Sequence, residues 1–95
     1  IKITLKDPDK KKAHKAAQII GQALVEKLGR KRVLGPEAPV IDKIRNHYLM
    51  EVFIKMERDK VNSNTVKKII REEMNKLGSM KDFKNTLIIP DVDPY

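Results

Sequence analysis

Two runs of basic side chains carry the most obvious chemistry in this sequence. Ammonium and guanidinium groups gathered in this way bind phosphate oxygens, so the runs indicate a polyanion-binding surface, most simply one for nucleic acid. The same pattern is typical of a solvated surface that keeps a small protein soluble, and both interpretations stay open. The first run is Lys10, Lys11 and Lys12 with Lys15, and the second is Arg30, Lys31 and Arg32.

The excess of positive charge is concentrated in the first half of the chain. The net charge of the 95 residues is +8. Residues 1–45 hold 12 basic and 5 acidic side chains, whereas residues 46–95 hold 9 and 8. This asymmetry favours a localised electrostatic surface over an evenly charged one.

A third group of candidates lies where a strand is expected to begin. Lys43 and Arg45 precede Tyr48, with His47 between them and the tyrosine. The two cations would contact phosphates, and the ring of Tyr48 would stack on an unpaired base. The alternative is that Tyr48 is an ordinary core residue with its hydroxyl at the edge of the sheet.

Residues for catalysis or metal binding are sparse. The absence of Cys excludes disulfides, a thiolate nucleophile and a Cys-ligated zinc site. His14 and His47 are far apart, and the four glycines are too scattered for a phosphate-binding loop. Asp91 and Asp93 are the carboxylate pair that comes nearest to a site, and without a nearby histidine we interpret them as part of a C-terminal turn. We therefore expect no catalytic residue, metal site or cofactor in this chain.

The elements that must position these residues fit a single domain over residues 1–95. Strict alternation over residues 1–6 predicts a strand with one buried face. Asp7 is expected to cap the following helix, with Pro8 in its first turn. Apolar residues at spacings of three and four then continue the helix to about Leu28, and Gly29 is expected to end it.

The middle of the chain reads as an irregular region followed by a hairpin. Pro36 and Pro39 predict an edge or irregular strand, because proline cannot donate a hydrogen bond to a neighbouring strand. Val40, Ile41 and Ile44 are expected to be apolar anchors. Asn46-His47 is expected to be the turn that leads into the next strand.

The remaining elements complete a βαββαβ order. We expect a strand over residues 48–57, a helix that begins near residues 62–64 and ends at Gly78, a buried Phe83, and a last strand over residues 86–90. This order predicts an α+β fold, a ferredoxin-like sandwich with two helices on one face of an antiparallel sheet. There is no apolar run near 18 residues, so no membrane-spanning helix is expected.

Two stretches go beyond a generic pattern. Residues 33–39 read Val-Leu-Gly-Pro-Glu-Ala-Pro and are followed by Arg-Asn-His-Tyr at residues 45–48, and the chain closes with Asp-Val-Asp-Pro at residues 91–94. In this order, the segments resemble the C-terminal domain of the bacterial primosomal replication-restart helicases, the PriA family. The resemblance covers nearly the whole chain. Arg45 and Tyr48 match the family's arginine and aromatic residue, whereas His47 stands where the family often has a second arginine.

The resemblance implies that the chain is the C-terminal part of a larger cytoplasmic, nucleoid-associated bacterial DNA helicase. ATP, magnesium and zinc would then be bound only by upstream parts of the parent protein, and this part would not be an enzyme. It also implies a fold like that of a small-subunit ribosomal protein. The implied partners are forked or single-stranded DNA, the rest of the helicase chain and the acidic tail of single-stranded-DNA-binding protein.

Two functions from different classes follow. The first is DNA binding without sequence specificity, in which the basic residues named above contact phosphates. The second is a protein-interaction module, because the expected start of the second helix offers free N–H groups beside Arg58, Lys60 and Lys67. A small hydrolase of the acylphosphatase type is disfavoured, because no convincing arginine-bearing phosphate loop is present.

Overall fold

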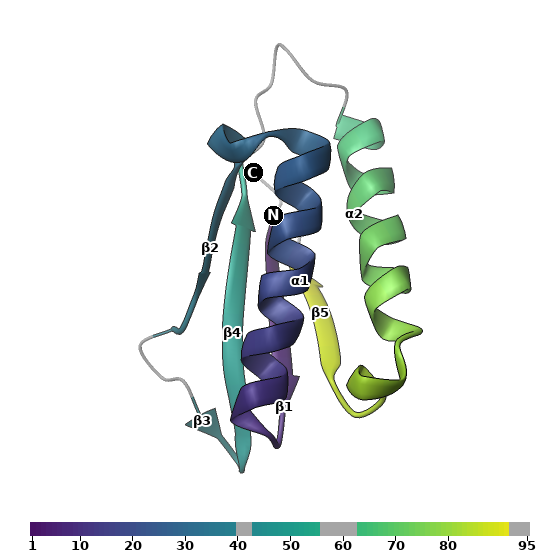
Figure 1. The fold of residues 1–95 in the computed structure, drawn as a ribbon. Coiled ribbons are helices and arrows are strands. Elements are labelled where there is room, and N and C mark those ends of the chain that lie inside the picture. Colours follow the sequence, from purple (N-terminus) through teal and green to yellow (C-terminus); the bar gives the residue numbers. More distant parts are fainter. Residues whose placement is uncertain (40–42, 56–62, 92–95) are drawn as a thin grey trace.

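The structure is a computed structural model that describes residues 1–39, 43–55 and 63–91 (Figure 1). It is an α+β domain with two helices packed on an antiparallel sheet. Its elements are β1 (Lys2–Asp7), α1 (Lys10–Leu28), the 3₁₀ turn η1 (Arg30–Arg32), β2 (Val33–Glu37), β3 (Lys43–Ile44), β4 (His47–Ile54), α2 (Ser63–Gly78), the 3₁₀ turn η2 (Lys81–Phe83) and β5 (Leu87–Asp91).

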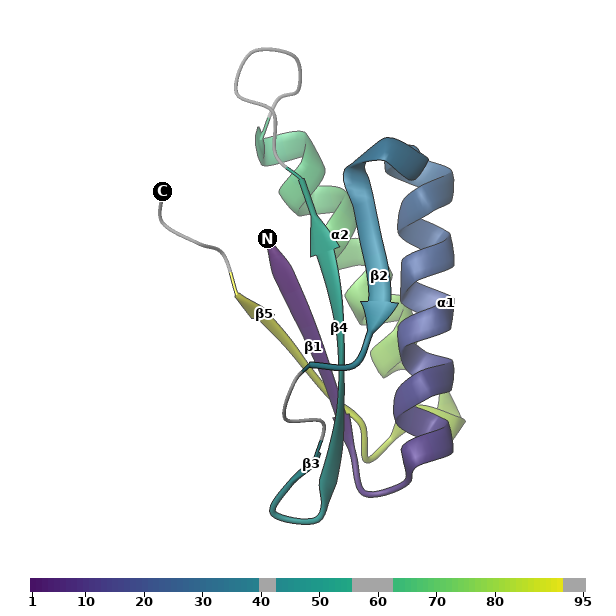
Figure 2. The ribbon, with the colours of Figure 1, turned by 90° about the vertical axis from the view of Figure 1, so that its left-hand side faces the viewer.

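The four longer strands lie in the order β2-β4-β1-β5, and the short β3 pairs with β4 at one end. All pairs are antiparallel. Both helices cover the same face of the sheet and leave the other face open (Figure 2). The element order and the strand order are compatible with the expected ferredoxin-like arrangement. Neither helix of the described residues is long and apolar enough to cross a membrane.

The core lies between the sheet and the two helices. Alternation places Ile3 and Leu5 of β1 and Val52 of β4 on the covered face, where their side chains are almost fully buried. The helices contribute the apolar stripes that the sequence predicts, and α1 packs against α2, β4 and β2. From α1 these are Ala13, Ala16, Ala17, Ile20 and Leu24, and from α2 they are Val66, Ile70 and Leu77.

The residue that caps α1 differs from the prediction. Asp9 is the N-cap, and its carboxylate accepts a hydrogen bond from the Lys11 N–H at 2.9 Å. The prediction of Asp7 is wrong because the Asp7 side chain turns inward and is 2% exposed. There its carboxylate accepts hydrogen bonds from the Asp9 N–H at 2.7 Å and from the hydroxyl of Thr86. Asp7 therefore joins the end of β1 to the segment that leads into β5.

The hairpin also departs from the prediction by one residue. The turn is Arg45-Asn46, and His47 already belongs to β4. Ile44 is not an apolar anchor, because it lies in β3 at the end of the sheet and its side chain is 45% exposed. Val40 and Ile41 lie outside the described residues. β4 ends at Ile54, and residues 56 and 57 of the predicted strand also lie outside the described residues.

The second helix buries one charged side chain that periodicity alone assigns to the surface. Glu73 is 7% exposed, and its carboxylate lies 3.3 Å from the Lys76 ammonium. Gly29 ends α1 with a φ of 95°, as expected, whereas Gly78 is the last residue of α2 and has no positive φ. Phe83 is buried, as predicted, at the end of η2.

The edge strand β2 is irregular, as its prolines predict. The register shifts between Leu34 and Glu37. Gly35 lies in this shift with a φ of 97°, and a Cβ atom there would be 2.9 Å from the Glu51 carbonyl oxygen. Only glycine fits a backbone that is both left-handed and this close to its neighbour.

Candidate nucleic-acid interface

The first basic run lies on the first turns of α1 and is exposed to solvent. Lys10, Lys11, Lys12 and Lys15 are all exposed, and the first turn holds no acidic residue. The buried stripe on Ala13, Ala16 and Ala17 fixes the helix on the sheet, so these lysines project from the opposite side and from the helix end. Positive charge here opposes the helix macrodipole, so it does not serve the stability of the helix.

The hairpin brings a second set of candidates to the same end of the molecule. Lys10 and Lys12 of α1, Tyr48 of β4 and Asn85 before β5 line one hollow of about 500 Å³. Asp7 and Asp9 also line it, and their carboxylates accept hydrogen bonds but keep their negative charge, so the excess positive charge of this end comes from the neighbouring cations rather than from the hollow itself. Segments about 35 residues apart in the chain thus meet at this end.

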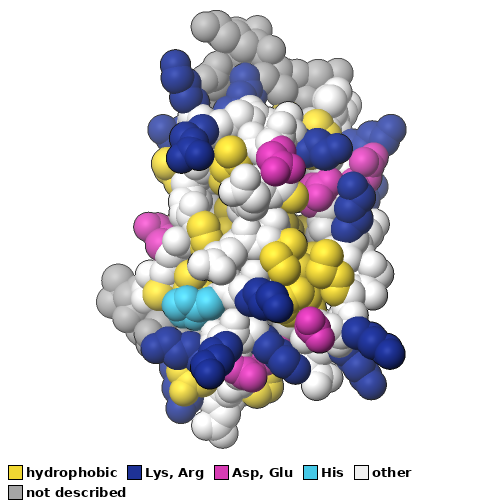
Figure 3. Space-filling model, viewed as in Figure 1, with side chains coloured by type: hydrophobic (Ala, Val, Ile, Leu, Met, Phe, Trp, Pro, Cys, Tyr) yellow, Lys and Arg dark blue, Asp and Glu magenta, His cyan; other side chains and the backbone are white. Residues whose placement is uncertain are grey.

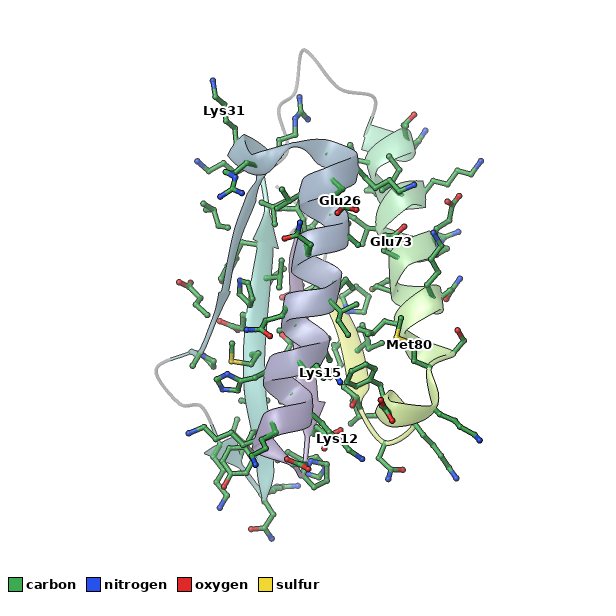
Figure 4. All side chains as sticks on the ribbon, in the orientation of Figure 1. Lys12, Lys15, Glu26, Lys31, Glu73 and Met80 are labelled. Atoms are coloured by element: carbon green, nitrogen blue, oxygen red, sulfur yellow. The ribbon has the colours of Figure 1, made fainter. Side chains whose placement is uncertain are left out.

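A neighbouring hollow of about 480 Å³ continues this surface along α1. It is lined by Lys10, Lys11, His14, Lys15 and Gln18, and Lys10 belongs to both hollows. Figure 3 shows Lys and Arg side chains gathered at the lower end of the helix-covered face. Lys12 and Lys15 lie at the lower half of α1 in Figure 4. We call the surface formed by Lys10, Lys11, Lys12, Lys15, Lys43 and Arg45 the basic end.

Tyr48 combines features of both interpretations that the sequence leaves open. Its side chain is half-buried and packs against the hydrophobic core. The Lys43 ammonium lies 5.1 Å from the centre of its ring, within the range of a cation–π contact. A base could stack on that face of the ring only after Lys43 moves. Base stacking by Tyr48 therefore stays a prediction.

The second basic run lies at the other end of α1. Arg30, Lys31 and Arg32 form η1 directly after the helix, and Lys31 lies at the upper end in Figure 4. Because α1 has 19 residues, the two runs are about 28 Å apart along its axis. Arg30 and Lys31 are exposed, whereas Arg32 is half-buried. The structure therefore divides the predicted phosphate contacts between two ends rather than gathering them into one patch.

The predicted protein-partner residues can be followed only in part. Arg58 and Lys60 lie outside the described residues. Lys67 is exposed on α2, where it lines a groove of about 140 Å³ together with Arg71 and the apolar side chains of Ile1, Ile70, Met74 and Pro90. The sequence pattern did not single out Arg71, although its spacing of four from Lys67 places the two on one helix face.

Sequence reasoning also missed the apolar character of the open sheet face. Leu34, Ile44, Leu87 and Ile89 are 40–52% exposed, and the strand registers place all four on this face. The charges near them are nearly balanced: Lys2 pairs with Glu51 at 3.4 Å, and Asp91 lies opposite Lys2. Phosphate contacts are therefore better served by the basic end than by this face.

Acidic residues on the described part of the chain do not gather into a metal site. No group of three or more potential ligands occurs within residues 1–39, 43–55 and 63–91. Asp91 is an exposed residue of β5 rather than part of a turn, and Asp93 lies outside the described residues.

Comparisons with protein-family models, with curated proteins and with solved structures found no match for this chain.

Proposed function

We propose that this chain is a DNA-binding domain that holds phosphates at the basic end without reading sequence. The observation that carries the proposal is the meeting of Lys10 and Lys12 of α1 with Tyr48 of β4 around one hollow, with the Lys43 ammonium over the Tyr48 ring. Lysine and arginine contacts to phosphate give affinity and strong salt dependence but little sequence specificity. The exposed Arg30 and Lys31 would contact a second phosphate segment at the far end of α1.

The position of the lysines in the helix supports this function over a merely solvated surface. Cations stabilise a helix near its C-terminal end and oppose the macrodipole near its N-terminal end. The first turn of α1 instead carries three lysines in succession and no acidic residue. Binding of an anion at this end would offset the unfavourable interaction with the macrodipole.

The resemblance of segments 33–39, 45–48 and 91–94 suggests the wider setting. On that basis the domain is ferredoxin-like, similar to a small-subunit ribosomal protein, and forms the C-terminal part of a cytoplasmic bacterial replication-restart helicase. The parent chain would supply the ATPase and the zinc-binding parts, and this domain would add contacts to forked or single-stranded DNA.

Salt-dependent binding tests the proposal. The logarithm of the DNA association constant is measured against the logarithm of the salt concentration for the wild type and for Lys10→Ala/Lys12→Ala. Each lost phosphate contact is expected to make the slope shallower by about 0.9 on duplex DNA or about 0.7 on single strands. The matched control is Lys67→Ala/Lys68→Ala, which removes the same charge from exposed positions of α2 that have no part in the proposed DNA contact. Equal slopes for the two double variants would refute the proposal.

The groove beside α2 favours a second function, binding of an acidic peptide such as the tail of single-stranded-DNA-binding protein. Its apolar lining by Ile70, Met74 and Pro90 suits a hydrophobic end residue, and Lys67 and Arg71 at its rim suit carboxylates. The test is titration with a short acidic peptide ending in phenylalanine. Lys67→Glu/Arg71→Glu should abolish binding, whereas Lys10→Ala/Lys12→Ala should leave it unchanged. Binding that survives the charge reversal would remove this groove from consideration.

A further inference from the structure

The hairpin formed by β3 and β4 projects from the basic end and forms the lower tip of the molecule in Figures 1 and 2. The last residue pair between β1 and β4 is Asp7–Tyr48. Beyond it, His47 has only Ile44 of β3 beside it in the sheet. The tip is therefore a two-stranded ribbon in which Ile44 and Arg45 are exposed and His47 is half-buried.

The turn carries a residue that its backbone does not favour. Arg45 and Asn46 have φ values of 49° and 67°, so both central residues of this two-residue turn are left-handed. Asparagine and glycine adopt this conformation readily, whereas a long side chain such as that of Arg45 does so at a cost. Arg45 is exposed, so packing against the core does not explain its presence. A strained residue that packing does not require points to function at the tip.

The side chains of the tip combine apolar and cationic surface. Ile44 lies directly opposite His47 on the open-face side of the ribbon, and 45% of its surface is exposed. The His47 ring is held in place by its Nδ1 atom, 3.1 Å from the Arg45 carbonyl oxygen. Arg45 lies at the turn beside this pair, and Lys43 lies on the other side of the ribbon. The result is a small apolar and aromatic surface on the open-face side of the ribbon, with the exposed Arg45 at the turn beside it.

This surface complements the end of a DNA duplex. The last base pair exposes a flat apolar face, and phosphates border that face. Apolar side chains inserted against base steps and rings stacked on bases are established ways of contacting this face.

We propose that the hairpin tip binds the exposed face of the last base pair where a DNA duplex opens into single strands. Ile44 and His47 pack on the base pair, and Arg45 contacts the adjoining phosphate. This inference rests on the proposed DNA binding and specifies the DNA structure that the basic end recognises. The domain would then select a junction by shape, with no contact that depends on base sequence.

The test compares a forked duplex with a closed dumbbell duplex that has no open end, at one salt concentration. The fork carries 2-aminopurine at its last base pair, so that contact with the base changes its fluorescence. The wild type should prefer the fork and change this fluorescence. Ile44→Thr replaces the ethyl branch by a hydroxyl and keeps the methyl group, so it removes only part of the exposed apolar surface and should reduce the preference about three- to tenfold.

Ile89→Thr is the matched control. Ile89 is 40% exposed on the same sheet face but lies in β5, on the far side of β1 from the hairpin. It should leave the fork preference unchanged. Equal effects of the two variants, or a wild type that binds the dumbbell as tightly as the fork, would overturn the proposal, and the second result would leave phosphate binding at the basic end without selection of a duplex end.

Arg45→Asn separates function from stability. Asparagine fits the left-handed turn, so the melting temperature should rise by about 4–8 °C while the fork preference falls. An unchanged preference would remove Arg45 from the contact and contradict the proposal. If Lys10→Ala/Lys12→Ala makes the salt slope shallower but Ile44→Thr has no effect, the hairpin proposal fails and the proposed DNA binding stands. If the wild type binds neither DNA, both fail.

Discussion

The hydrogen bond between Thr86 and Asp7 should be a major source of stability for the basic end. It joins residues 79 positions apart and is fully buried. Thr86→Val keeps the shape of the side chain but removes the hydroxyl donor, so that one carboxylate oxygen of Asp7 loses its partner. Because Asp7 is 2% exposed, water cannot replace that donor without opening the structure.

The size of the effect follows from the charge of the acceptor. Hydrogen bonds to charged groups contribute about 1.5–3 kcal/mol, and a buried partner left without a bond adds to the loss. We therefore expect Thr86→Val to lower the free energy of unfolding by about 2–3 kcal/mol. For a domain of this size, each kcal/mol corresponds to about 4–8 °C in melting temperature.

Urea unfolding followed by circular dichroism would measure this change. The matched control is Thr4→Val, since Thr4 is a half-buried residue of β1 on the open face of the sheet. It should change the free energy of unfolding by no more than about 0.5 kcal/mol. A double-mutant cycle with Asp7→Asn should give a coupling energy well above zero. Equal effects of Thr86→Val and Thr4→Val, or a coupling energy near zero, would refute this account of the contact.

Two further pairs of substitutions test the stability of α1 and of the irregular strand β2. Lys10→Ala/Lys11→Ala/Lys12→Ala should raise the free energy of unfolding by about 1–2 kcal/mol at low salt, because the three charges oppose the macrodipole of α1. Lys27→Ala, in the last turn, should instead lower the free energy of unfolding. Denaturation experiments should show both effects at low salt and neither at high salt, because salt screens these charges. Gly35→Ala should destabilise the domain by more than about 2 kcal/mol, because its φ is 97° and a Cβ atom would lie 2.9 Å from the Glu51 carbonyl oxygen. Gly78→Ala, where the nearest atom would be 3.8 Å away and φ is not positive, should be neutral or stabilising in the same thermal melts.

Local pattern was sufficient to predict most of the fold. Alternation in residues 1–6 and 48–54 and the apolar stripes of the two helices place the core residues correctly, because a buried face must repeat with the period of its element. The prolines predict the irregular edge strand for an equally local reason. The prediction is wrong where two nearby residues could take the same role. Asp7 and Asp9 are both able to cap α1, and only the position of Thr86 makes the buried place favourable for Asp7.

The candidate site was predictable in its residue types but not in its grouping. Charge runs are visible in a sequence, whereas the distance between them depends on how the chain folds back. The hairpin lies beside the start of α1 because β4 pairs along the whole of β1. The same helix separates Arg30 and Lys31 from the basic end by about 28 Å. The neighbouring residues in the sequence do not predict the exposure of Ile44 either, because an isoleucine in a strand is buried only if another segment covers it.

The basic character of this protein and its two helix faces were thus determined by the order of residues along the chain. Charge and periodicity are properties of neighbours in sequence, and they require no knowledge of the fold. Only the tertiary structure decided which cations lie together, which acidic side chain is buried and which apolar residue is exposed at the hairpin tip. Each of these depends on contacts between segments that are distant in the chain.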